Sequence, residues 1–320
     1  MRINTNMAAL NAWRSMTVNT SSMTKSLEKL SSGYRVNRAA DDAAGLAVSE
    51  KMRAQIRGLN MAIRNAQDGV SLVQTAEGGA QKIQDMLQRM RELAVQASSG
   101  TLQKSDKDLL QKEFKQLQQE ITRTAKSSKF NDIPLASVIN GVTDGTAFPP
   151  PNAGDEFEDY ATKSISIQVG PGATDQDKID VTVADLRAEV LGVAVEWEVG
   201  NETFYAISDL DISAQAEYDT DGDLTKYAGA EVAIKVIDSA LTKLSEIRAT
   251  FGAVQNRLEA AIETLQIQSE NLTAAESRIR DVDMAQEMAT FTKYQILQQA
   301  STAMLAQANQ STQAILSLLR

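Results

Sequence analysis

The sequence predicts a mainly α-helical fold: an elongated antiparallel coiled-coil bundle formed by both chain ends, with a small β-hairpin-rich insertion in the middle. Three observations indicate it. Apolar residues recur in both flanks at coiled-coil spacing. All five prolines lie between Pro134 and Pro171, and glycine is absent before Gly33 and after Gly252, so helix breakers concentrate in the middle. Aromatic residues form only 5% of the chain, which is typical of an aliphatic helical core.

The clearest apolar seam runs from Ile247 to Val282. Alternating steps of four and three residues meet apolar side chains at every position except Gln268: Phe251, Val254, Leu258, Ala261, Leu265, Leu272, Ala275 and Ile279. A mean period of 3.5 residues predicts a supercoiled helix. The register fails after Val282, and this phase break predicts a domain boundary.

The N-terminal half contains partners for this helix. The same step gives Met52, Ile56, Leu59, Ile63, Ala66, Val70 and Val73, and after one phase slip Ala76, Ala80, Ile83, Leu87, Met90, Ala94 and Ala97. Beyond the break at Ser98-Ser99-Gly100, one face of a third helix carries Leu110, Phe114, Leu117, Ile121 and Thr124. Three long helices with matching seams predict a bundle closed between the two halves of the chain.

The outermost segments carry looser apolar stripes among many Ser, Thr, Asn and Gln residues. Their apolar members include Leu10, Leu27 and Leu30 at one end, and Met284, Met288, Phe291, Met304, Ile315 and Leu319 at the other. We expect these ends to be poorly ordered in a free monomer and to become helical once neighbouring copies bury them. The alternative is an ordinary antiparallel helix pair folded within one chain.

The middle of the chain changes period. Residues 164–169 and 178–183 alternate like strands on either side of a Gly-Pro-Gly turn, and residues 193–199 and 202–207 suggest a second hairpin. Residues 148–151 and 154–160 are expected to form an exposed loop. Residues 144–231 contain 20 acidic and four basic residues, which indicates a solvent-facing surface.

These observations predict three parts. Residues 1–43 and 283–320 form terminal helical segments, and residues 44–193 and 232–282 form a coiled-coil rod with a hairpin. Residues 194–231 form a small acidic β-rich insertion.

Composition excludes much chemistry. The chain has no Cys and no His, which removes thiolate nucleophiles, imidazole bases and the commonest zinc ligands. A net charge of -10 disfavours nucleic acid and anionic membrane as partners, and no run of about 20 apolar residues could span a bilayer. The first residues lack the apolar region of a secretory signal peptide. We therefore expect no enzyme, no cofactor, no nucleic-acid or membrane partner and no cleaved signal.

Three remaining motifs have simpler explanations than a site. The run Asp219-Thr220-Asp221-Gly222-Asp223 resembles part of a calcium loop, but the closing twelfth ligand would be Ala228, so an acidic turn is favoured over a metal site. Asp41-Asp42 is a carboxylate pair better explained as charge at a helix N-terminus. Four Asn-x-Ser/Thr patterns, at Asn19, Asn201, Asn271 and Asn309, arise often by chance.

Long strings at both ends resemble bacterial flagellins. The N-terminal ones are Met1-Arg2-Ile3-Asn4-Thr5-Asn6, Leu30-Ser31-Ser32-Gly33-Tyr34-Arg35-Val36-Asn37 and Asp41-Asp42-Ala43-Ala44-Gly45-Leu46-Ala47. The C-terminal ones include Gln255-Asn256-Arg257-Leu258 and the run from Glu270 to Ala285. The resemblance covers residues 1–143 and 232–320 closely.

The resemblance implies a structural subunit that polymerises into the filament used for swimming motility. Its terminal segments would form the filament inner core, and residues 194–231 would be a small variable outer insertion. The implied partners are copies of itself, an export chaperone, the filament cap, hook-junction proteins and Toll-like receptor 5. It also implies an extracellular location after export by the flagellar type III system.

The receptor expectation rests on one helix. The segment Gln88-Arg89-Met90-Arg91-Glu92-Leu93-Ala94-Val95-Gln96 is similar to the stretch that Toll-like receptor 5 recognises in many flagellins. The resemblance makes Arg89, Leu93, Gln96 and Glu113 the contacting residues. The alternative is that Arg89 and Glu113 serve only packing between subunits.

Two other functions compete. A hook–filament junction protein would share the terminal helices, but the match through residues 278–285 and in the Arg89 helix favours the filament subunit. A cytoplasmic coiled-coil adaptor would be a stable dimer with protease-resistant ends, and it explains none of the strings.

Overall fold

The computed structural model describes residues 6–137, 162–188, 191–198, 201–214, 217–218, 224–226 and 229–318. The chain divides into two compact units. We call residues 60–266 the central unit, and residues 1–59 together with 267–320 the terminal unit. The loops expected at 148–151 and 154–160 and the turn at 219–223 lie outside the described residues.

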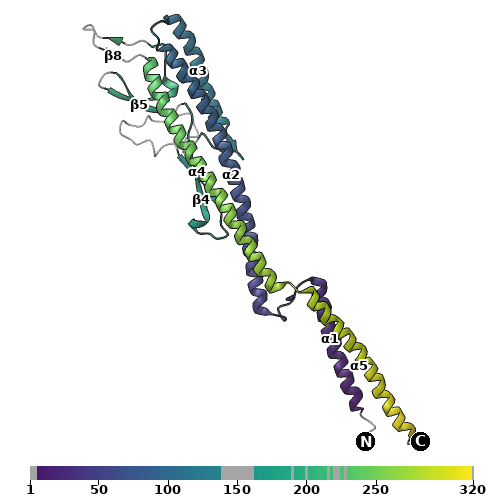
Figure 1. Ribbon diagram of the computed structural model, residues 1–320. Coiled ribbons are helices and arrows are strands. Elements are labelled where there is room, and N and C mark those ends of the chain that lie inside the picture. The colour runs from purple at the N-terminus through teal and green to yellow at the C-terminus, as the bar shows by residue number, and fades with distance from the viewer. Residues whose placement is uncertain are drawn as a thin grey trace. The chain divides into compact units, whose positions relative to one another are not determined.

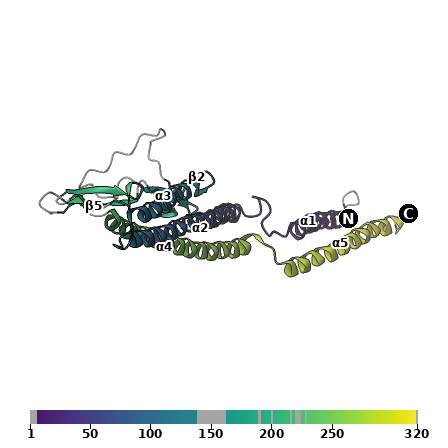
Figure 2. The ribbon, with the colours of Figure 1, turned by 90° about the horizontal axis from the view of Figure 1, so that it is seen from above.

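The central unit is built on three helices that lie side by side (Figures 1 and 2). These are α2 (Ala43–Ala97), α3 (Lys104–Ser127) and α4 (Gly229–Arg280); α2 and α4 extend into the terminal unit. The predicted seams face the core, where Ile83, Leu87, Met90, Phe114, Ile121, Phe251 and Leu258 are all buried. Arg91 Nε also donates to Asp238 Oδ1 at 2.5 Å, tying α2 to α4. The predicted helical bundle is confirmed.

Small β-structures pack beside these helices. The first predicted hairpin is observed as β3 (Thr162–Gln168) and β4 (Lys178–Ala184), antiparallel, with Ile165 opposite Val181. The second is β5 (Gly192–Glu198) and β6 (Asn201–Ala206). Two short strands, β7 (Glu217–Tyr218) and β8 (Leu224–Lys226), complete a sheet of order β6-β5-β8-β7. Two 3₁₀ turns, Asp175–Asp177 and Ile207–Asp209, precede β4 and follow β6.

The β3–β4 hairpin approaches α2 closely because Gly69 has no side chain. A Cβ added there would lie 2.5 Å from Ile167 Cδ1. Ile167 is buried, as are Val169, Ile179, Val181 and Val183 on the hairpin. The alternating pattern of the hairpin thus places its apolar side chains in the core of the bundle.

The terminal unit contains an antiparallel helix pair, α1 (Met7–Ser32) and α5 (Met284–Leu318) (Figure 1). Asn6 caps α1 by accepting from the backbone N–H of Ala9, and α1 ends at Gly33, whose φ of 74° is the left-handed conformation that glycine adopts freely. Near the phase break at Val282, α4 ends at Arg280 and α5 begins at Met284.

The two units divide inside α2 and α4, whereas the sequence places domain boundaries at 43/44 and 282/283. Those boundaries stay a prediction. The helix pair itself has the arrangement that the sequence analysis gave as the alternative, an antiparallel pair within one chain.

Candidate self-assembly surface

Polar contacts join α1 to α5. Asn19 Nδ2 donates to Ser301 Oγ at 3.1 Å, and Ser26 Oγ donates to Glu287 Oε1 at 2.5 Å. Ser26 and Ser301 are buried, and at the open end of the pair Asn6 Nδ2 donates to the carbonyl oxygen of Ala308 at 3.0 Å. Small polar side chains therefore face each other inside the pair.

Large apolar side chains of the pair are exposed instead. Of the residues that the sequence nominated, the exposed ones are Leu10, Leu27, Met284, Met288 and Met304. Leu30 and Phe291 are half-buried. Ile315 belongs to α5 but its side chain is not among those described, and Leu319 lies outside the described residues.

Other large apolar residues are exposed on the same two helices, and of these the sequence stripe includes only Met7. They are Met7, Trp13 and Val18 on α1, and Ile296 and Leu297 on α5. Trp13 follows Leu10 by three residues, which is one helical turn, so the periodicity could have found it. We call the exposed apolar residues of α1 and α5 the terminal apolar face.

Hydroxyl groups on this face are already satisfied inside their own helices. Thr17, Thr20 and Thr24 donate to the carbonyl oxygens of Trp13, Met16 and Thr20, at 2.9 to 3.0 Å. With Trp13 and Met16 these threonines line a shallow hollow of about 380 Å³ on α1. Another surface can cover this hollow without leaving those hydroxyls unpaired, so the usual cost of burying a polar group is reduced.

The connectors between the helices of the terminal unit are clasped together. Arg35 N–H donates to the carbonyl oxygen of Arg280 at 2.6 Å, and Val282 N–H donates to that of Gly33 at 3.0 Å. The Arg280 guanidinium, only 12% exposed, donates to Glu50 Oε1 at 2.6 Å and lies 4.7 Å from the centre of the Tyr34 ring. This hydrogen bond lowers the pKa of Glu50. We call Tyr34, Glu50 and Arg280 the connector clasp.

The carboxylate pair at the start of α2 serves local structure. Asp42 Oδ1 accepts from Gly45 N–H at 2.8 Å, which caps α2. Asp41 Oδ2 accepts from Arg38 N–H and Asn37 N–H, and the bond from Arg38 contributes most to lowering the pKa of Asp41. Across the part of the chain that the structure describes, no group of three carboxylates could hold a metal, and no helix is long and apolar enough to cross a membrane.

The four residues expected to contact Toll-like receptor 5 comprise three exposed residues and one core residue. Arg89 joins α2 to α3 through Glu113, with Nε and Nη2 at 3.0 and 2.9 Å from Oε1, and it also bonds Glu92. The hydrogen bond that Arg89 donates to Glu92, and then those it donates to Glu113, raise the pKa of Arg89. Arg89, Gln96 and Glu113 are exposed.

Leu93 differs from the other three nominated residues. Its side chain is 1% exposed and belongs to the core, where it holds α2 in place. Helical spacing predicts this burial, because Leu93 follows Met90 by three residues and precedes Ala97 by four, and both of these lie on the predicted apolar seam. Beside it, Gln88, Arg91, Val95 and Gln96 line a shallow hollow of about 520 Å³.

The chain resembles known proteins along its whole length. The bacterial flagellin N-terminal helical region matches residues 3–140, and the bacterial flagellin C-terminal helical region matches residues 234–319. A flagellin of Bacillus subtilis (strain 168) is 47% identical over 322 residues, and the match covers 100% of both chains. The flagellar filament 33 kDa core protein of Treponema phagedenis is 43% identical over 320 residues, with the same full coverage.

One solved structure with a similar fold is that of a putative flagellar hook-associated protein from Vibrio parahaemolyticus. It aligns with a TM-score of 0.54 and covers 75% of this chain and 100% of that one. At 12% sequence identity, this likeness concerns the fold alone.

Proposed function

The chain belongs to the bacterial flagellin family and is a subunit of the flagellar filament, and we propose that it assembles through the terminal apolar face. The hook–filament junction protein is not favoured, since full-length identity reaches 47% with a flagellin but only 12% with the hook-associated structure. The coiled-coil adaptor is not favoured either, because the matching relatives are flagellar proteins.

The main support for the proposal is that the α1–α5 pair buries polar side chains and exposes large apolar ones. A polar seam faces inward while Trp13, Met288 and Met304 face solvent. An exposed apolar patch on a soluble protein marks an interaction site. Burying such side chains against neighbours stabilises a polymer by about 25 cal/mol per Å² of apolar area removed from water.

An unlimited filament requires a particular kind of contact. When one surface patch binds a different patch on the next copy and the rotation does not close, subunits add indefinitely. Two unlike helices, α1 and α5, supply unlike patches. We propose that neighbouring copies cover both and that the pair gains its full order only there.

A matched pair of variants tests the assembly surface. Met304→Gln removes an apolar side chain that is 64% exposed on α5, and Leu109→Gln removes one that is 62% exposed on α3 of the central unit. A loss of about 1 to 2 kcal/mol at the interface raises the critical concentration for polymerisation about 5- to 30-fold. We expect this rise for Met304→Gln and less than a twofold change for Leu109→Gln, measured by sedimentation of filaments at increasing protein concentration. Equal behaviour of the two variants would refute the proposed surface.

A separate experiment tests whether the terminal segments are ordered in the free monomer. Limited proteolysis of the monomer is expected to remove about 40 residues from each end, because unpaired terminal segments are cut first. The trimmed core should not polymerise. Protease-resistant ends in the monomer would contradict the requirement for neighbours.

The same face suggests the assembly partners. Before assembly, exposed apolar residues on α5 need a cover against premature association, which an export chaperone would supply. We propose export by the flagellar type III system, and terminal contacts with the filament cap and hook-junction proteins.

A second candidate function is recognition by Toll-like receptor 5. The exposed ion pair of Arg89 with Glu113, together with Gln96, supports it, and Leu93 would act only by holding the helix.

A further inference from the structure

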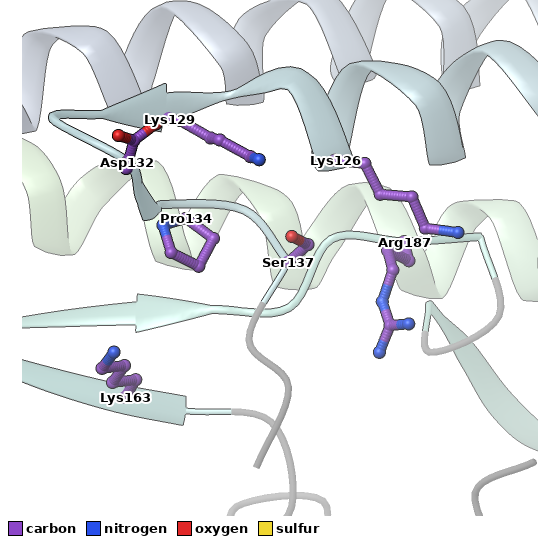
Figure 3. Close-up of a pocket in the computed structure, with 7 residues that line it drawn as sticks. All are labelled: Lys126, Lys129, Asp132, Pro134, Ser137, Lys163 and Arg187. Atoms are coloured by element: carbon purple, nitrogen blue, oxygen red, sulfur yellow. The ribbon is translucent and has the colours of Figure 1, made fainter. Parts of the chain in front are cut away.

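A hollow in the central unit is lined mainly by cations, although the chain around it is acidic. Its volume is about 440 Å³, and the charged and polar groups that line it are Lys126, Lys129, Asp132, Ser137, Lys163 and Arg187 (Figure 3). Only four basic residues occur between positions 144 and 231, against 20 acidic ones. Two of those four, Lys163 and Arg187, line this one hollow.

Four separate segments bring these side chains together. Lys126 lies in the last turn of α3, and Lys129 begins the two-residue strand β1 (Lys129–Phe130), which pairs with β2 (Ile133–Pro134). The turn between them uses Asn131 and Asp132 with φ of 49° and 61°. Both values are positive, as a tight hairpin turn requires. Lys163 lies in β3, and Arg187 follows β4.

Backbone hydrogen bonds fix the floor of the hollow. Leu186 N–H donates to the carbonyl oxygen of Ala136 at 2.9 Å, which holds the segment after β2 against the segment after β4. Leu135 N–H donates to that of Ser128 at 3.0 Å. Ser137 is buried, and in Figure 3 it lies between Arg187 and Lys163. The lining is therefore held by main-chain contacts independent of the lysine side chains.

Among the residues that the structure describes, cations outnumber carboxylates in the lining of the hollow. Arg187 is neutralised by the buried carboxylate of Asp185, with Nε 3.0 Å from both oxygens and Nη2 2.7 Å from Oδ2. The ammonium groups of Lys126, Lys129 and Lys163 make no ion pair with any described residue. Among the lining residues that the structure describes, Asp132 is the one carboxylate. Like charges gathered in one place repel each other, and a bound anion relieves this repulsion.

We propose that this hollow binds a phosphate or sulfate group, either free or carried on an extracellular polysaccharide. Lysine is a compact point charge that suits such oxyanions, and three lysines on different segments can approach one group from several sides. Residues 144–231 are strongly acidic, so the cations that line this hollow stand out from the charge of the chain around them. A flagellar filament subunit outside the cell would be accessible to polysaccharides that carry sulfate or phosphate groups.

Isothermal titration calorimetry of the full-length chain tests the proposal. The probes are inorganic phosphate, inorganic sulfate and a sulfated tetrasaccharide, each at low ionic strength. The double variant Lys126→Gln/Lys163→Gln is compared with Lys112→Gln/Lys115→Gln, which removes the same charge from exposed positions elsewhere on α3. We expect saturable binding that weakens at least tenfold in the first variant and less than twofold in the second.

The outcomes separate the sources of the anion. Binding of all three probes supports a site for the free ion, and binding of the tetrasaccharide alone supports the polysaccharide. No saturable binding of any probe overturns the proposal, as does an equal loss in both double variants. Thermal unfolding followed by circular dichroism shows whether each variant is folded, and Lys129→Gln alone, expected to weaken binding severalfold, repeats the test with one substitution.

Discussion

The central and terminal units use helices of the same kind in opposite ways. Among the described residues, 38 of the 40 buried hydrophobic residues lie in the central unit, and the other two are Val36 and Leu59. The terminal unit holds 12 of the 15 large hydrophobic residues that are exposed; the other three are Met61, Val95 and Leu109. The central unit therefore has its own core, whereas the terminal unit leaves most of its large apolar side chains exposed, and we propose that neighbouring copies bury them.

This difference shows how one chain can be stable and still polymerise. A core contained in one unit gives stability that does not depend on concentration. Surface left for neighbours gives stability that appears only when copies are present. The predictions below test whether the two properties are separable, beginning with the largest expected effect.

Truncating one phenylalanine in each unit should give opposite results. Phe251 is 2% exposed in the central core, so Phe251→Ala is expected to lower the free energy of unfolding by about 3 to 5 kcal/mol. Phe291 is half-buried on α5, and Phe291→Ala should change monomer stability much less while it weakens polymerisation. Chemical denaturation of the monomer and sedimentation of filaments measure the two effects. A large loss of monomer stability in Phe291→Ala would mean that the terminal unit has a core of its own.

Two glycines on α2 allow a finer comparison inside the central unit. Gly69→Ala brings a Cβ against Ile167, and the resulting overpacking should cost about 1 to 3 kcal/mol. Gly78 has no atom within 4 Å of an added Cβ, so Gly78→Ala should stabilise the helix by about 0.5 to 1 kcal/mol. Thermal denaturation of the two variants gives the sign of each change. Stabilisation by both substitutions would show that the hairpin does not press on α2.

The connector clasp should make the terminal unit sensitive to acid. The hydrogen bond from Arg280 lowers the pKa of Glu50 from its ordinary value of 4.5. A lowered pKa in the folded state means that the unfolded state binds the proton more readily, so the contribution of Glu50 is complete above pH 4.5 and is lost as the pH falls through the folded value.

The pH dependence can be isolated with two variants. Glu50→Gln is expected to be less stable than the original chain at neutral pH and equal to it in acid, where Glu50 is protonated. Glu270→Gln removes an exposed carboxylate from the same unit and should leave the pH profile unchanged. Urea unfolding between pH 3 and 7, followed through the amide signals of Arg35 and Val282, measures the difference. A Glu50→Gln profile parallel to the original would contradict the role of the clasp.

The sequence predicted those parts of the molecule that depend on local periodicity. The seam through Phe251, Leu258 and Leu265 is buried as the four-three spacing indicates. The β3–β4 hairpin follows from alternation and from the Gly-Pro-Gly turn. The break between α4 and α5 lies where the register fails.

The features that the sequence did not predict depend on contacts between distant residues or on very short elements. The connector clasp joins residues more than 200 positions apart in the sequence, and no local sequence pattern predicts it. Strands β1 and β2 have two residues each, too short for a period, and only the Asn131-Asp132 turn marks them. For Leu93 the family resemblance suggests a receptor contact, whereas helical spacing predicts a buried side chain, and its side chain is buried.

The smallest effect on stability is expected at the surface of the central unit. Arg89 and Glu113 are about half exposed, and exposed ion pairs contribute little because water and salt screen them. Arg89→Ala should therefore leave the melting temperature within about 2 °C of the original, since a surface substitution changes little. If Arg89 contacts Toll-like receptor 5, binding of the monomer to the receptor ectodomain should nevertheless fall at least tenfold. Arg123→Ala, which removes a similar exposed pair with Glu120 from α3, is the control and should bind normally. Loss of binding in both variants, or in neither, would contradict the receptor proposal while leaving the contrast between the two units intact.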